Sequence, residues 1–181
     1  LVMDFSGTLS GEGRNTVLVP PGNDYAIRVM RTERSPVQAD YFDATTEPDQ
    51  VKSFIRQLTD KILYGVIIKE LAVAGTSSGK GIYLRSVKES LFSDLWIVNT
   101  YGGAALFVDT DVMETEFRNI HCHNNGSLKN KQATLVIASA GGQAANNLHF
   151  TQVYLLHPNY IAAQIGTDVD KNAPRLLFFH Q

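Results

Sequence analysis

The stretch Phe92-Ser93-Asp94-Leu95-Trp96-Ile97 carries the pattern that decides the fold of this chain. The pattern has six positions: an aromatic residue, any residue, a short polar residue, an aliphatic residue, any residue, and a second aliphatic residue. The pattern recurs, with small changes, at Ile68-Lys69-Glu70-Leu71-Ala72-Val73, Phe117-Arg118-Asn119-Ile120-His121-Cys122, Phe150-Thr151-Gln152-Val153-Tyr154-Leu155 and, cut short, Phe179-His180-Gln181. Its first positions are 24 to 33 residues apart, a spacing typical of stacked structural repeats.

Each repeat is predicted to contain three short strands. The alternation on either side of the third, polar position predicts two strands that meet at a corner. Asn and Asp suit this corner because they tolerate the left-handed backbone conformation, and Glu70 and Gln152 suit it less well. A third strand is predicted about ten residues upstream of each aromatic position, at Gly81-Ile82-Tyr83-Leu84, Gly103-Ala104-Ala105-Leu106, Ala133-Thr134-Leu135-Val136 and Tyr160-Ile161-Ala162-Ala163.

Strands placed over their counterparts one repeat earlier form parallel sheets around one apolar interior. The sequence therefore predicts an all-β fold, a right-handed parallel β-helix, whose handedness follows from the strong preference of parallel crossovers. In its interior we expect a column of Phe92, Phe117 and Phe150 beside a column formed by Leu95, Ile120 and Val153.

The chain is expected to be a single domain over residues 1–181 and part of a longer polypeptide. Residues 1–34 are predicted to form opening coils, and residues 65–181 regular ones. Residues 35–64 break the pattern and are predicted to be a partly helical excursion, because their apolar residues fall near one face of a helix. The long loops of residues 65–181 are where function is expected to lie.

The composition of the chain limits the classes of partner that it is expected to bind. A net charge of −2 gives no bulk attraction to nucleic acid or to an anionic membrane surface, and we expect neither nucleic-acid binding nor membrane insertion. No cofactor is expected. Cys122 falls at an inward strand position, where its thiol acts as a small apolar group.

The opening Gly11-x-Gly13-x-x-Thr16 followed by Val-Leu-Val, with the repeated Gly-Ile-x-Leu and Phe-x-Asn-Ile-x-Cys phrases, resembles the pectate-lyase-like β-helix proteins. The closest resemblance is to the version found in bacteriophage tailspikes and tail fibres. It implies a bacterial surface polysaccharide as partner, a homotrimer, contact with other tail or baseplate proteins, and a location in the virion. The sequence motifs of pectate lyases and polygalacturonases are missing, so pectin is not the expected substrate.

Several residues are candidates for a polysaccharide site. On the outer face of the strand after the corner, Trp96, His121 and Tyr154 should lie one above the next, where their rings could stack on sugars or fill a seam between subunits. His121 and His123 share that face, but two ligands do not make a metal site, and no metal is expected. Tyr83, Arg85 and Arg118 are further candidates for substrate binding, the two arginines as clamps for an anionic group.

Catalysis would require carboxyl groups on adjacent coils for hydrolysis, or a base beside a group that neutralises a uronate for elimination. The candidate acids are Glu89, Asp109, Asp111, Glu114 and Glu116. Solvated turn charge is the simpler interpretation of these residues.

Three functions remain open. The first is a phage tailspike-like or tail-fibre-like protein that binds a bacterial surface polysaccharide during host attachment, with or without cleaving it. The second is a secreted, extracellular bacterial polysaccharide lyase or glycoside hydrolase. The third is a structural β-helix spacer without catalytic activity.

Overall fold

The computed structural model describes residues 1–30, 62–138, 145–166 and 175–180, and within them it is all-β. The strands follow in the order β1 (Val2–Met3), β2 (Thr8–Ser10), β3 (Val17–Leu18), β4 (Tyr25–Val29), β5 (Leu63–Tyr64), β6 (Ile67–Ala74), β7 (Lys80–Leu84), β8 (Val87–Lys88), β9 (Leu91–Val98), β10 (Leu106–Val108), β11 (Val112–His123), β12 (Leu135–Ile137), β13 (Asn146–Leu156), β14 (Ala163–Ile165) and β15 (Arg175–His180). One 3-10 turn, η1 (Gly13–Asn15), lies between β2 and β3.

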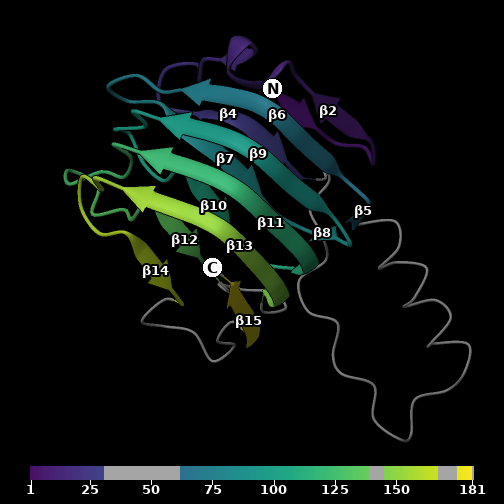
Figure 1. Ribbon diagram of the computed structural model, residues 1–181. Helices are drawn as coiled ribbons and strands as arrows, with labels where there is room; N and C mark the ends of the chain where they lie inside the picture. Colours follow the sequence, from purple (N-terminus) through teal and green to yellow (C-terminus); the bar gives the residue numbers. More distant parts are fainter. Residues whose placement is uncertain (31–61, 139–144, 167–174, 181) are drawn as a thin grey trace, which may run out of the picture.

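The named strands pair in parallel into two sheets (Figure 1). Sheet A has the strand order β1-β4-β7-β10-β12-β14. Sheet B has the order β15-β13-β11-β9-β6-β2, and in it β3 also pairs with β6, β8 with β11, and β5 with β8. In both sheets each strand lies beside its counterpart from the neighbouring repeat. The described residues contain no helix long and apolar enough to cross a membrane.

Sheet B is strongly curled because each long strand bends at the polar third position of the repeat (Figure 1). The left-handed conformation occurs at all four predicted corners, with φ of 56° at Glu70, 54° at Asp94, 51° at Asn119 and 54° at Gln152. Glu70 and Gln152 thus adopt the corner as fully as Asp and Asn do, since the in-register strands on both sides impose one backbone path. The Asn119 amide also donates to Asp94 Oδ1 at 2.7 Å, which joins neighbouring corners.

The interior contains the two predicted columns. The rings of Phe92 and Phe117 stack with centroids 5.3 Å apart, those of Phe117 and Phe150 with centroids 4.8 Å apart, and Phe179 adds a fourth ring 4.9 Å from Phe150. Ile120 pairs in register with Leu95 and Val153, as expected. Cys122 is buried at its inward position, and burial raises the pKa of its thiol to about 12.

Two predictions about element boundaries need correction. The third strands of the later repeats begin later than predicted: Ile82 pairs with Leu106, so β10 begins where the phrase Gly103–Leu106 was expected to end. Register depends on the backbone path through the loops, which the apolar pattern of this Ala-rich segment does not fix. The expected helix falls mostly outside the described residues, but Leu63, assigned to its apolar face, is buried in β5.

Gly81 must be a glycine because the backbone of the next repeat leaves no room for a side chain. A Cβ atom there would lie 1.9 Å from the carbonyl oxygen of Ala105. The close approach of the two backbones allows Gly81 N–H to donate to Ala104 O at 2.9 Å. The glycine of the Gly-Ile-x-Leu phrase therefore has a packing role.

The loop expected between Asn124 and Gln132 is held by a buried side chain. The Oδ1 atom of Asn125 accepts from the backbone N–H and the hydroxyl of Thr100, at 3.0 and 2.9 Å, and its amide donates to Ile97 O at 2.7 Å. The loop is thus tied to the end of β9, in sheet B, and to the turn that follows it.

Candidate functional site

The predicted outer column exists as a continuous stack of rings. The Trp96 and His121 rings are parallel, with centroids 4.1 Å apart, and His121 and Tyr154 follow at 4.7 Å. The guanidinium of Arg14, from η1, lies 3.2 Å from the centroid of the Trp96 ring and closes the far end. It can reach there because the residue paired with Trp96 in the preceding repeat is the small Ala72.

This stacking changes what the column can bind. Each of the Trp96 and His121 faces is already covered by a neighbour, so the column presents ring edges to solvent. Among the described residues no further ring covers the face of Tyr154 away from His121, and Tyr154 is 43% exposed. In this arrangement the faces of Trp96 and His121 are covered by neighbours, and the two expected uses of the column, a sugar platform or a subunit seam, both stay predictions.

The surroundings of His121 favour its neutral form. Its Nε2 atom lies 3.0 Å from Asn119 Oδ1, and burial, with a smaller contribution from the charge of Arg14, lowers its pKa from 6.5. A neutral imidazole can stack between Trp96 and Tyr154 without bringing a buried charge.

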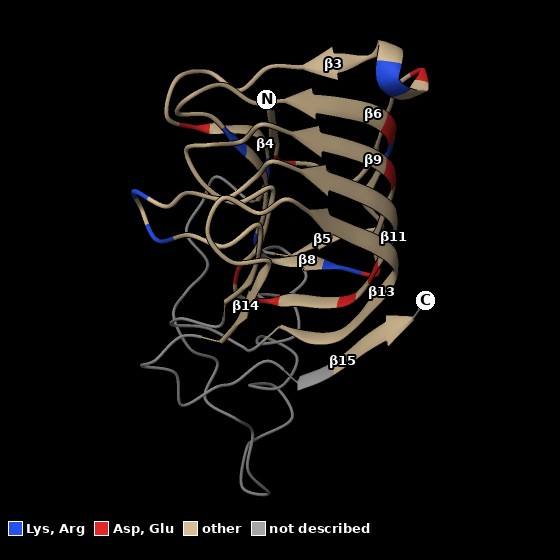
Figure 2. Ribbon diagram, turned by 60° about the vertical axis from the view of Figure 1, so that its left-hand side comes forward, with Lys and Arg blue, Asp and Glu red and all other residues tan. Residues whose placement is uncertain are grey.

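The strand residues of the facet of sheet B that holds this column carry no formal charge, and the guanidinium of Arg14, from η1, borders the facet at one end. The four segments after the corner, residues 71–74, 95–98, 120–123 and 153–156, contain no Lys, Arg, Asp or Glu, and these strand ends are uniformly tan in Figure 2. Their outward side chains are Ala72, Ala74, Trp96, Val98, His121, His123, Tyr154 and Leu156. We call this surface the uncharged facet.

Two of the candidate acids lie on either side of one lysine. Lys88 Nζ is 3.7 Å from Glu89 Oε1 and 3.3 Å from Glu114 Oε2. Burial alone would lower the pKa of Lys88, but the hydrogen bond to Glu114 and the nearby negative charges outweigh it, and the pKa is raised. Both glutamates have left-handed backbone conformations: Glu89 lies between β8 and β9, and Glu114 lies near the start of β11.

The other acids are separate from that pair. Glu116 Oε1 lies 3.8 Å from Arg118 NH1, which makes a surface ion pair of the predicted acid and the predicted anion clamp. Asp111 takes a left-handed φ of 59° at the turn before β11. The acids are thus engaged in separate contacts: Glu89 and Glu114 with Lys88, Glu116 with Arg118, and Asp109 with Tyr83.

A second aromatic cluster lies on the outer side of sheet A, over three neighbouring strands. Tyr83 of β7 is 5.3 Å from Tyr25 of β4 and 5.6 Å from Phe107 of β10, between ring centroids, and Tyr25 is 6.3 Å from Phe107. The rings are tilted by 32° to 76°, so they do not cover one another's faces as the column on sheet B does. We call this surface the sheet A cluster.

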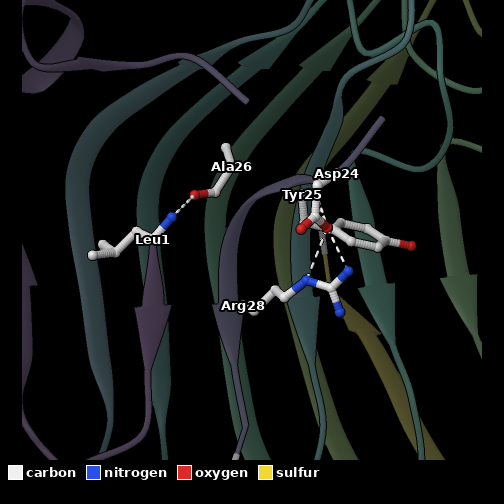
Figure 3. Close-up of polar contacts among 5 residues, drawn as sticks. All are labelled: Leu1, Asp24, Tyr25, Ala26 and Arg28. Atoms are coloured by element: carbon white, nitrogen blue, oxygen red, sulfur yellow. Dashed lines mark hydrogen bonds and ion pairs between the residues drawn. The ribbon is translucent and has the colours of Figure 1, made fainter. Parts of the chain in front are cut away.

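Polar groups border these rings. The Tyr83 hydroxyl donates to Asp109 Oδ2 in a short hydrogen bond, and Asp109 Oδ1 accepts from the backbone N–H of Thr110 at 2.8 Å. Burial, and then the hydrogen bond to Asp109, raises the pKa of Tyr83, and so Tyr83 is a hydrogen-bond donor and a poor base. Arg28 donates from Nε to Asp24 Oδ1 at 2.8 Å beside the Tyr25 ring (Figure 3).

Sequence reasoning identified Tyr83, Arg85 and Asp109 but not Tyr25, Asp24, Arg28 or Lys80. β4 and β7 are separated in the chain by residues 31–61, so no repeat spacing indicated that they pair. Alternation does place Arg28 of β4 outward between the buried Ile27 and Val29, a signal that could have identified it.

Among the described residues no group of three or more His, Cys, Asp or Glu side chains is arranged to hold a metal ion. Comparison with known proteins adds no further constraint: no family model, no curated protein and no solved structure matches this chain.

Proposed function

We propose that the coils form a right-handed parallel β-helix belonging to a phage tailspike-like or tail-fibre-like protein, and that this protein binds a bacterial surface polysaccharide during host attachment. The parallel pairing of successive repeats, the two interior columns and the corner residues support the β-helix. A stacked-repeat fold suits a long ligand because it presents equivalent surface on each successive coil.

The observation that carries the polysaccharide proposal is the sheet A cluster. Tyr83 and Phe107 are half-buried, and their rings are tilted. Aromatic faces pack against the C–H faces of sugars, and bordering polar groups can bond to sugar hydroxyls. Asp24, Arg28 and Asp109 supply such groups from the same face.

Binding is better supported than cleavage. A hydrolase needs two carboxyl groups on either side of a glycosidic bond, one of them able to give up a proton. Here Glu89 and Glu114 share Lys88, Glu116 faces Arg118, and Asp109 accepts from Tyr83. The contacts of these four acids give each a structural role, so the proposal does not require catalysis.

The same proposal includes a homotrimer with the uncharged facet at the subunit seam. Ring edges and small apolar side chains without formal charge can approach a second copy with no like-charge repulsion. Sedimentation equilibrium should give a trimer for the chain and a monomer for Val98→Glu, which puts a charge in the facet. Gln152→Glu, at an exposed corner outside the facet, is the matched control and should remain trimeric. A monomeric wild-type chain would remove the seam from the proposal.

The polysaccharide proposal is tested by direct binding to extracted capsular and O-antigen polysaccharides, with the polymer size followed at the same time. We expect binding without a fall in polymer size, and a loss of at least about tenfold in affinity for Tyr83→Ala because the central ring of the cluster is removed. Tyr101→Ala removes an exposed ring from a loop and should bind like the wild type. Binding to none of the polysaccharides would overturn the proposal, and depolymerisation would favour the enzyme alternative.

A further inference from the structure

Three cationic side chains surround the rings of the sheet A cluster. The guanidinium carbon of Arg28 is 5.5 Å from the Tyr25 centroid and 5.7 Å from the Tyr83 centroid. Lys80 Nζ lies 5.3 Å from the Tyr25 centroid. Arg85 directly follows β7, two residues after Tyr83, and its charge acts on the Tyr83 hydroxyl. These distances place two of the cations at the ring edges or faces, within the range of cation–π contacts.

The acids of the cluster are already engaged. Asp24 is bonded to Arg28, and this hydrogen bond is the main cause of the lowered pKa of Asp24. Asp109 accepts from a hydroxyl and from a backbone N–H. In the part of the chain that the structure describes, no salt bridge joins Lys80 or Arg85 to a carboxylate. Among the described residues, Lys80 and Arg85 therefore have no carboxylate at salt-bridge distance, although the charge of Lys80 also acts on Asp24.

The local charge is opposite in sign to that of the whole chain. Arg28, Lys80 and Arg85 outnumber Asp24 and Asp109, whereas the chain carries a net charge of −2. An arginine keeps free donors after it bonds one carboxylate oxygen, since guanidinium has five N–H groups. The rings would hold the apolar face of a sugar while Lys80 and Arg85 remain able to bond an anionic substituent.

The geometry points to an anionic polysaccharide, one that bears carboxylate or sulfate groups, as the ligand class of the sheet A cluster. This inference rests on the proposed polysaccharide binding and narrows it. A neutral polymer would gain the ring contacts alone and would leave the partly desolvated cations without a partner. Because the attraction is between charges near the surface, it should weaken as salt shortens the Debye length.

The test uses immobilised chain and polymers that differ only in charge. The probes are hyaluronan and alginate, each native and carboxyl-reduced, together with dextran sulfate and unmodified dextran. Extracted capsular polysaccharides before and after carboxyl reduction complete the set. We expect native polymers to bind at least about tenfold more tightly than their reduced forms, with the difference falling sharply between 0.05 and 0.5 M salt, values chosen to span the Debye range. Dextran sulfate distinguishes sulfate recognition from carboxylate recognition.

Variants connect the preference to the named residues. Lys80→Gln and Arg85→Gln should each weaken binding of the anionic polymers about tenfold and leave binding of the reduced polymers unchanged. Lys69→Gln removes a cation from sheet B, where Lys69 pairs with Glu70 at 3.3 Å, and should change neither. Circular dichroism of each variant checks that it is folded.

The possible outcomes distinguish the preference for anionic polymers from the proposed polysaccharide binding itself. Equal binding of native and reduced polymers would overturn this inference and leave the proposed polysaccharide binding in place. The inference would also be overturned if Lys69→Gln weakened binding of the anionic polymers as much as Lys80→Gln does, because the attraction would then not be specific to the sheet A cluster. Binding to no polymer at all would overturn both.

Discussion

Phe117→Ala tests the interior column where it is most confined. The Phe117 side chain is fully buried, at 0% exposure, and its ring stacks on Phe92 at 5.3 Å and on Phe150 at 4.8 Å. Truncation of a buried phenylalanine costs about 3 to 5 kcal/mol of unfolding free energy, because apolar contact is lost and a cavity remains. Each aromatic pair contributes a further ~0.5 to 1.5 kcal/mol. With two pairs lost, we expect a value near the upper end, about 4 to 5 kcal/mol.

Phe179→Ala is the matched control. It belongs to the same column, but it stacks on Phe150 alone and is 57% exposed. Its truncation leaves no closed cavity, so the expected cost is about 1 kcal/mol. The pair of variants thus compares the same chemical change at two depths.

Urea denaturation measures both costs from the shift of the midpoint at constant slope. For a chain of this size, a loss of about 4 kcal/mol corresponds to a fall in the melting temperature of roughly 8 to 16 °C. A loss below about 2 kcal/mol for Phe117→Ala, or an equal loss for Phe179→Ala, would show that the column is not packed as described.

Three further predictions concern the outer surface. The pKa of His121 is lowered in the folded chain, so its contribution to stability is complete above its ordinary pKa of 6.5 and is lost as the pH falls through the folded pKa. Thermal melts from pH 7.5 to 5 should show this loss of stability in the wild type and less of it in His121→Gln. Arg14→Ala should lower the unfolding free energy by about 0.5 to 1 kcal/mol and raise the pKa of His121, read by NMR titration, whereas an unchanged pKa would mean that Arg14 does not act on the ring. Gln152→Gly should stabilise by about 1 kcal/mol because φ is 54° there, and Gln152→Val should destabilise by at least as much; equal melting temperatures would contradict the corner assignment.

The sequence predicted the part of the fold that repeats. Phe92, Phe117 and Phe150 occupy equivalent places in successive repeats, so the repeated pattern in the sequence corresponds to a stacked column in the structure. The same holds for Trp96, His121 and Tyr154. Their ring orientation was not predictable, since spacing fixes which face a residue lies on but not whether its ring turns its face or its edge to solvent.

The sheet A cluster shows where prediction from the sequence failed. Tyr25 and Arg28 come from β4, which reaches β7 only after residues 31–61 have intervened, and no local pattern relates the two strands. The Gly103–Leu106 phrase was aligned too early because alanines give little information about which positions face inward. Prediction from this chain was therefore reliable where one repeat directly follows another, and failed where the coil is interrupted or its composition is uniform.

The two outer faces suit different roles. Stacked rings that cover each other, on strand residues without formal charge, fit contact with another protein surface better than contact with a solvated sugar. Tilted rings bordered by hydrogen-bonding and cationic groups fit the reverse. Because the uncharged facet belongs to sheet B and the cluster to sheet A, a seam along one would leave the other open along the length of the coils, so assembly and polysaccharide binding need not compete for the same surface.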